Sequence, residues 1–229
     1  YDKFEVPRPQ TMWLTERNYE TLPNWVRERR YGIHGIDHME TGPLDNDPVP
    51  SLPGLYRRFA ETVHGLDENG GRILDYLDTS GLAKNTVVIY SSDQGFYLGD
   101  HGWFDKRFMY EESFRMPLMV RWPGHIKPGT RQALASSIDL APTILAATDI
   151  RPEKTLPGHN LLALAADPHA TRKTIYGEIF AHDVADIDRP SASLQYRWLR
   201  HGAWKLISRA GSTTPQLFNL ANDPHETRD

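Results

Sequence analysis

The stretch Ser91-Ser92-Asp93-Gln94-Gly95-Phe96-Tyr97-Leu98-Gly99-Asp100-His101-Gly102-Trp103-Phe104-Asp105-Lys106 decides how this chain is interpreted. It follows an uninterrupted apolar, β-branched run from Thr86 to Tyr90, which is typical of a strand buried on both faces of a parallel sheet. In open α/β sheets, ligands bind beyond the carboxyl ends of the strands. The sequence therefore predicts a ligand site directly after residue 90.

Three side chains in this stretch indicate the chemistry of that site. Asp93 and Gln94 offer oxygen atoms, which hard cations such as Ca2+ and Mg2+ prefer as ligands. Lys106 follows far enough along the loop to fold back over the same point with a compact positive charge. Oxygen ligands beside an ammonium group suit a tetrahedral oxyanion, either sulfate or phosphate.

The composition excludes some classes of partner. The chain has 229 residues, enough for one large domain or for one domain and a smaller second one. Its formal net charge of −4 argues against a broad basic face, so nucleic acid is not expected as a partner. There is no cysteine and no apolar run of membrane-spanning length, so neither a disulfide nor a membrane span is expected.

The pattern of the chain predicts three regions. Residues 1–53 are rich in proline and predict an irregular segment, residues 54–165 carry helix and strand patterns in alternation, and residues 166–229 predict short antiparallel strands. Within these regions we expect helices over 53–82, 108–115 and 139–148, and strands over 86–90, 118–121, 133–136, 174–179, 195–200, 203–208 and 216–219, with a hairpin turn at His201-Gly202. The long helix should bury one apolar face that includes Leu55, Phe59, Val63, Leu66, Ile73, Leu74 and Leu77.

The segment from Asn85 to Gly124 resembles a sulfatase of the alkaline-phosphatase superfamily, in the branch where the second pair of metal ligands reads Asp-Gln. The resemblance rests on Ser-Asp-Gln-Gly-Phe after a strand, on Leu-Gly-Asp-His-Gly-Trp, on Lys106 at its spacing, and on Tyr-Glu-Glu-Ser-Phe-Arg-Met-Pro at 110–117. It extends well over 54–229 and only loosely over 1–53. It implies an α/β fold, namely the C-terminal part of a sulfatase-like α/β sandwich with a mainly parallel sheet, plus a small antiparallel β subdomain.

The resemblance also implies roles for the three side chains. Asp93 and Gln94 would be ligands of Ca2+ or Mg2+, and Lys106 would be a catalytic residue that binds the sulfate and the leaving-group oxygen. The substrate would be a sulfated carbohydrate or another small sulfated metabolite. The family's nucleophile is a formylglycine made from Cys or Ser in a Cys/Ser-x-Pro-x-Arg motif. This sequence contains no such motif, because Leu55 stands where the pattern that begins at Ser51 needs Arg.

We therefore expect the nucleophile to come from an N-terminal part of the same protein that precedes these residues. That part would be a binding partner of the present chain, and the chain alone would be inactive. The resemblance also implies a periplasmic, secreted or lysosome-like location.

Four further residues are candidates for substrate contact. His101 could donate a hydrogen bond, Trp103 could stack on a sugar ring, and Arg107 could bind a second anionic group. His182 could reach the rim of the site from the C-terminal subdomain. For both histidines, the alternative is a hydrogen-bonded structural role.

Two other functions are compatible with the same residues. A phosphodiesterase or phosphonate monoester hydrolase of the superfamily would use similar electrostatics, and parallel assays with aryl sulfate and aryl phosphodiester would separate it from a sulfatase. A non-catalytic relative that binds sulfated ligands would lack the Cys or Ser motif in the preceding part of the protein.

Overall fold

The computed structural model describes residues 5–12, 52–106, 108–167, 169–179 and 195–228. The chain forms two compact units. Unit 1 comprises residues 1–75, 94–116 and 218–229, and unit 2 comprises residues 76–93 and 117–217. The predicted domain boundaries after residues 53 and 165 come from the sequence pattern, whereas the two units are defined by their compactness. These domain boundaries stay predictions.

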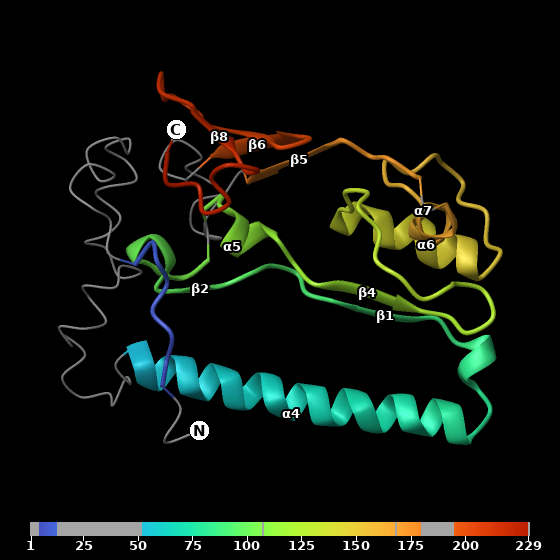
Figure 1. Ribbon diagram of the computed structural model, residues 1–229. Helices are drawn as coiled ribbons and strands as arrows, with labels where there is room; N and C mark the ends of the chain where they lie inside the picture. Colours follow the sequence, from blue (N-terminus) through green and yellow to red (C-terminus); the bar gives the residue numbers. More distant parts are fainter. Residues whose placement is uncertain (1–4, 13–51, 107, 168, 180–194, 229) are drawn as a thin grey trace. The chain divides into compact units, whose positions relative to one another are not determined.

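The first described helix is α4, Leu52–Thr79, a single uninterrupted helix (Figure 1). Gly81 follows its end with φ 77°, a left-handed conformation that is common directly after helices and that glycine adopts readily. The prediction of a buried apolar face is wrong for the described structure, since Phe59, Val63, Leu66 and Ile73 are 39%, 44%, 54% and 60% exposed. Helical periodicity marks an apolar face, but burial also needs a packing partner.

A short 3-10 helix, η2 (Ala83–Asn85), leads into β1 (Val88–Ser91). β1 pairs with β4 (Leu118–Arg121), and Val88 lies opposite Arg121 in an antiparallel register. The prediction that the strand following residue 85 has parallel neighbours is therefore wrong for this pair. β1 is also only partly covered, because Tyr90 is 40% exposed.

In unit 1, the predicted loop after residue 94 is a short hairpin. β2 (Tyr97–Leu98) pairs antiparallel with β3 (Phe104–Asp105), and the turn between them contains the 3-10 helix η3 (Asp100–Gly102). The one-turn helix α5 (Glu111–Phe114) follows. The core of this unit is aromatic and includes Tyr97, Trp103, Phe108, Tyr110 and Phe218.

In unit 2, η4 (Ser137–Asp139) leads directly into α6 (Leu140–Ala147), and α7 (Leu161–Ala166) follows. Ser136 and Asp139 form a capping box, in which Ser136 is the N-cap of η4 and Asp139 is the third helical position. The predicted strand over 133–136 is wrong, because this segment has no strand assignment.

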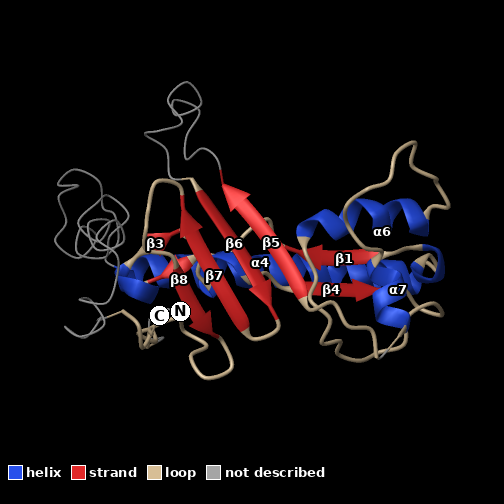
Figure 2. Cartoon of the chain, turned by 90° about the horizontal axis from the view of Figure 1, so that it is seen from above, coloured by secondary structure: helices blue, strands red, loops and turns tan. Residues whose placement is uncertain are grey.

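The C-terminal region is the antiparallel sheet that the sequence predicts. Figure 2 shows its four strands side by side in the order β5-β6-β7-β8. β5 pairs antiparallel with β6, and β6 with β7. The β6–β7 turn is Gly202-Ala203, one residue later than predicted, because His201 still pairs with Trp204. The strands span Thr174–Ile179 (β5), Tyr196–His201 (β6), Trp204–Arg209 (β7) and Gln216–Asn219 (β8).

Among the described helices, none has both the length and the apolar character that a membrane crossing requires.

Candidate functional site

The predicted metal ligands lie directly after β1. Asp93 is exposed, and its Oδ1 atom lies 3.5 Å from the hydroxyl of Ser92. Gln94 is half-buried and begins the part of unit 1 that contains the hairpin. The residue after it, Gly95, is fixed by its amide, which donates a hydrogen bond to the carbonyl oxygen of Ser113 at 2.7 Å.

Gly95 lies against the backbone of α5. A Cβ atom at this position would overlap the carbonyl oxygen of Glu112. Glycine is therefore required by the close approach of two backbones, because no other residue leaves this space empty. Gln94 is therefore bonded directly to a residue whose backbone is fixed against α5.

The hairpin returns Lys106 to the point where the hairpin begins. Tyr97 lies opposite Asp105 in the register, so the next residues outward are Phe96 and Lys106. Asp105 has φ 78°, which turns the chain as it leaves β3. Lys106 is half-buried. The hairpin thus brings Lys106 and Gln94 to the same end of one small element, although their roles as sulfate-binding residue and metal ligand stay predictions.

His101 and Trp103 are both 2% exposed, so the structure places them in the aromatic core of unit 1 rather than on a surface. The Trp103 ring stacks on Phe108 with centroids 4.1 Å apart, and the His101 ring stacks on Tyr110 with centroids 4.4 Å apart. Rings covered in this way offer no face to a sugar. The geometry favours the structural alternative for His101 and a core role for Trp103.

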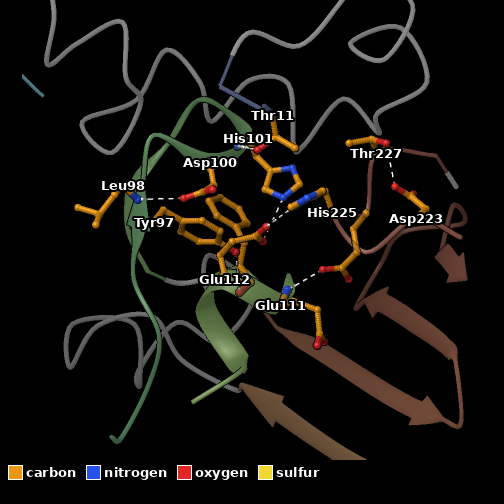
Figure 3. Close-up of polar contacts among 12 residues, drawn as sticks. Thr11, Tyr97, Leu98, Asp100, His101, Glu111, Glu112, Asp223, His225 and Thr227 are labelled. Atoms are coloured by element: carbon orange, nitrogen blue, oxygen red, sulfur yellow. Dashed lines mark hydrogen bonds and ion pairs between the residues drawn. The ribbon is translucent and has the colours of Figure 1, made fainter. Parts of the chain in front are cut away.

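The sequence analysis missed Glu112, whose carboxylate lies between two histidines (Figure 3). Its Oε2 atom is 3.2 Å from Nε2 of His101, and its Oε1 atom is 3.8 Å from Nδ1 of His225. Burial alone would raise the pKa of Glu112, but the hydrogen bond and positive charge of His101, with its own backbone amide and His225, lower the pKa below its ordinary value. Glu112 is therefore held as a carboxylate.

The C-terminal segment completes this part of unit 1. The Oε2 atom of Glu226 accepts a hydrogen bond from the amide of Glu111 at 2.6 Å, at the start of α5. Asp223 accepts hydrogen bonds from the Thr227 hydroxyl and from the Arg228 amide. These contacts fix the residues around His225 and so hold its ring beside Glu112.

Two nearby groups have raised pKa values. Burial, assisted by the negative charge of Glu112, raises the pKa of Tyr97 well above its ordinary value. Burial also raises the pKa of Asp100, although the amide of Leu98, which donates a hydrogen bond to Asp100 Oδ2 at 3.2 Å, acts in the opposite direction.

The cation site that the sequence predicts stays a prediction. No group of three or more His, Asp or Glu side chains able to hold a metal ion occurs among them. Asp93 and Gln94 remain suitable as two oxygen ligands of a larger shell. Arg107 and His182 lie outside the described residues, so their predicted substrate contacts stay predictions.

Comparison with known proteins gives a consistent result. Residues 99–229 match the family described as N-sulphoglucosamine sulphohydrolase, C-terminal. The N-acetylglucosamine-6-O-sulfatase of Bacteroides thetaiotaomicron is 49% identical over 148 residues, which are 62% of this chain and 26% of that protein. A solved protein in complex with its substrate, D-glucosamine-2-N,6-O-disulfate, is similar with a TM-score of 0.76 and 27% identity over 98% of this chain and 55% of that one.

A more distant solved structure is the phosphonate monoester hydrolase of Agrobacterium radiobacter, with a TM-score of 0.60 and 27% identity over 69% of this chain and 33% of that one.

These similarities confirm the sulfatase resemblance and the α/β fold with an antiparallel C-terminal sheet. The chain spans about a quarter of the Bacteroides sulfatase and about half of the solved substrate complex. The family match covers more than half of the chain and includes β3, Lys106, Glu112 and the C-terminal sheet. The chain therefore belongs to the N-sulphoglucosamine sulphohydrolase C-terminal family.

Proposed function

We propose that this chain is the C-terminal part of a sulfatase that hydrolyses a sulfate group on an amino sugar or related carbohydrate. The observation that carries the proposal is the similarity of 98% of the chain to a protein solved with D-glucosamine-2-N,6-O-disulfate as its substrate. The name of the 49% identical relative, an N-acetylglucosamine-6-O-sulfatase, supports the same class of substrate.

Lys106 is the residue of this chain that acts on the sulfate group. Hydrolysis of a sulfate ester requires stabilisation of negative charge on the peripheral oxygens and on the leaving oxygen. An ammonium group at the open end of the hairpin supplies a compact positive charge for both tasks. Its half-buried position favours this role, because charge interactions strengthen where water is partly excluded.

Asp93 and Gln94 contribute two oxygen ligands to a divalent cation, Ca2+ or Mg2+. The acidic side chain and the amide fit a hard cation, and the remaining ligands come from other parts of the protein. When bound, such a cation neutralises charge on the sulfate oxygens. Gly95, the residue after Gln94, is fixed by its contact with α5.

The nucleophile, a formylglycine in this proposal, lies outside these 229 residues. The chain contains neither cysteine nor a Ser-x-Pro-x-Arg sequence from which formylglycine could form. The chain alone is therefore inactive, whereas the whole protein hydrolyses the sulfate ester. Adding the chain by itself to an aryl sulfate should release no phenol above the buffer rate.

The test uses the whole protein with an aryl sulfate and with glucosamine 6-O-sulfate. Lys106→Ala should lower kcat by about 10²- to 10³-fold and spare cation affinity, because it removes stabilisation of developing charge. Asp93→Ala should lower cation affinity and activity together. Lys127→Ala is the matched control, since Lys127 is an exposed lysine of unit 2. Wild-type activity in both site variants would refute the proposed site.

A phosphonate monoester hydrolase is the second candidate, and the 27% identical structure from Agrobacterium radiobacter favours it. The same protein preparation should be assayed with an aryl phosphonate monoester and an aryl phosphodiester. Faster turnover of either phosphorus ester than of the sulfates would reverse the ranking. Tight binding of sulfated glucosamine without turnover of any ester would instead identify a non-catalytic relative.

A further inference from the structure

The Gln94–Lys106 hairpin carries two residues of the proposed site at its open end and a buried histidine in its turn. The register of β2 and β3 places Phe96 and Lys106 next outward from the Tyr97–Asp105 pair, and Gln94 precedes Phe96 by two residues. His101 lies in the turn, with φ 56° and 2% exposure. Few non-glycine residues adopt a positive φ, so the turn needs other contacts to hold this conformation.

One residue outside the hairpin contacts both of its ends. The carbonyl oxygen of Glu112 lies against Gly95, next to Gln94, and leaves no room for a side chain there. The carboxylate of Glu112 reaches Nε2 of His101, in the turn, at 3.2 Å (Figure 3). The backbone and side chain of a single residue therefore set both the start of the hairpin and its tip.

The surroundings of His101 restrict the ring to this contact. The ring stacks on Tyr110 with an interplanar angle of 17°, and it meets the edge of Tyr97 at 90°. The His101 amide donates a hydrogen bond to the Thr11 hydroxyl at 3.0 Å. The stacking contact with Tyr110 and the hydrogen bond of the amide therefore tie the position of the imidazole to that of the turn.

Glu112 is in turn fixed from the far end of the chain. His225 lies 3.8 Å from its second oxygen, and Glu226 holds the amide of the preceding residue, Glu111. The Glu112 side chain is 17% exposed, so its bond to His101 is only weakly screened by water. The C-terminal segment thereby supports the same hairpin.

We infer that Glu112 is a positioning residue, which acts through His101 to hold the Gln94–Lys106 hairpin and thereby the ammonium group of Lys106. The inference rests on the proposed function of Lys106. Glu112 itself is assigned no contact with the substrate, so its removal should displace Lys106 without removing any group that binds sulfate.

The first experiment measures amide hydrogen exchange across residues 94–106 in the whole protein. Glu112→Gln keeps the backbone and the volume but removes the charge, and it should raise exchange in this segment by about tenfold or more. The matched control is Glu68→Gln, which breaks a second histidine–glutamate pair, His64–Glu68, whose side chains are 56% and 66% exposed. The control should leave exchange in 94–106 unchanged.

The second experiment is a double-mutant cycle on kcat for aryl sulfate. Glu112→Gln should lower kcat by about 10- to 100-fold in the wild-type background, as supporting residues of active sites commonly do. In the Lys106→Ala background the same substitution should have almost no effect, because the group that it positions is gone. A role in overall stability would lower activity by the same factor in both backgrounds.

The outcomes separate the inference from the proposed function. Unchanged exchange in Glu112→Gln, or equal losses of kcat in both backgrounds, would overturn the positioning role. If the whole protein hydrolyses no sulfate ester, the proposed function fails. The exchange result then decides alone whether Glu112 holds the hairpin.

Discussion

Two carboxylates organise the two units of this chain, and they differ in what they hold. Asp139 in unit 2 is 0% exposed and accepts hydrogen bonds from the amides of Ser136 and His159, each at 2.8 Å, and from the Arg172 guanidinium. Glu112 in unit 1 is 17% exposed and lies between the imidazoles of His101 and His225.

The difference lies in the partners. The donors to Asp139 are the amides of Ser136 and His159 and the guanidinium of Arg172. Through His159 and Arg172, Asp139 joins η4 to the segment 159–172. None of these residues belongs to the proposed site. The partner His101 of Glu112 belongs to the hairpin that carries Lys106. A fully enclosed carboxylate with three donors should therefore matter most for stability, and a partly exposed one with two imidazoles should matter most for the geometry of the site.

The largest effect should come from removal of the Asp139 carboxylate. Asp139→Ala leaves Arg172, whose side chain is 12% exposed, without its buried counter-charge, and it leaves two amides without acceptors. Breaking a buried pair in this way costs about 3–5 kcal/mol. Denaturant unfolding of the protein, with hydrogen exchange of peptides from 136–172, should show this loss in unit 2.

The control for Asp139 is a second aspartate–arginine pair in the same unit. Asp78 lies 2.6 Å from Arg121, but the two side chains are 55% and 36% exposed. Asp78→Ala should therefore cost about 1 kcal/mol or less. If Asp139→Ala is no more destabilising than Asp78→Ala, burial does not distinguish the two centres and the comparison fails.

The next effect concerns the backbone contact of Glu112. Gly95→Ala places a methyl group against the Glu112 carbonyl oxygen, so the hairpin or α5 must shift. Overpacking of this kind costs about 1–3 kcal/mol, and displacement of Lys106 should lower kcat for aryl sulfate more than the stability loss predicts. Thermal unfolding and kinetics of the same preparation measure both quantities.

Gly65→Ala provides the opposite expectation in the same unit. Gly65 lies within α4, and nothing lies within 4 Å of the position that its Cβ atom would occupy. The change should be neutral or should stabilise the helix by about 0.5–1 kcal/mol. Equal behaviour of the two glycine variants would show that the Gly95 contact is unimportant.

Local elements of both units follow from the sequence more closely than their packing does. β4, β5 and β8 have the predicted bounds, because short apolar or alternating runs bounded by turn residues define strands locally. The burial of α4 depends on which element packs against it, and the direction of the β1 pairing depends on which strand lies beside it. The periodicity of one segment gives no information about its neighbours.

The candidate site divides in the same way. The motif that contains Asp93, Gln94 and Lys106 is contiguous, so it can be recognised from the sequence. The partners of Glu112 are not contiguous with it in the sequence. His101 precedes it by eleven residues, and His225 lies near the end of the chain. The Glu-Glu pair at 111–112 is visible in the sequence, but no spacing rule indicates which carboxylate turns inward.

A smaller effect should follow from the N-cap of α7 in unit 2. The side chain of Asn160 accepts a hydrogen bond from the amide of Leu162 at 2.9 Å, which satisfies a free donor of the first turn. Asn160→Ala should cost about 1 kcal/mol. Hydrogen exchange of α7 should rise while the hairpin of unit 1 is unaffected, and a rise in exchange at 94–106 would contradict the separation of the two centres.

The smallest effect is the pH dependence of the Glu112 centre. The pKa of Glu112 is lowered from its ordinary value of 4.5, so the folded state favours the carboxylate. Its contribution to stability is therefore present above pH 4.5 and is lost as the pH falls through the lower, folded pKa. Asp100, whose pKa is raised by burial and also by the charge of Glu112, acts with the opposite sign, and only the burial contribution is common to wild type and Glu112→Gln.

The difference in hairpin exchange between wild type and Glu112→Gln should therefore be largest near neutral pH and should shrink below pH 4.5. Protonation of Glu112 removes the charge that faces His101 and His225, which is the change that the substitution makes permanently. Exchange rates corrected for their intrinsic pH dependence give this difference directly. A difference that stays constant from pH 7 to pH 3 would mean that the shape of the Glu112 side chain, rather than its charge, holds the hairpin.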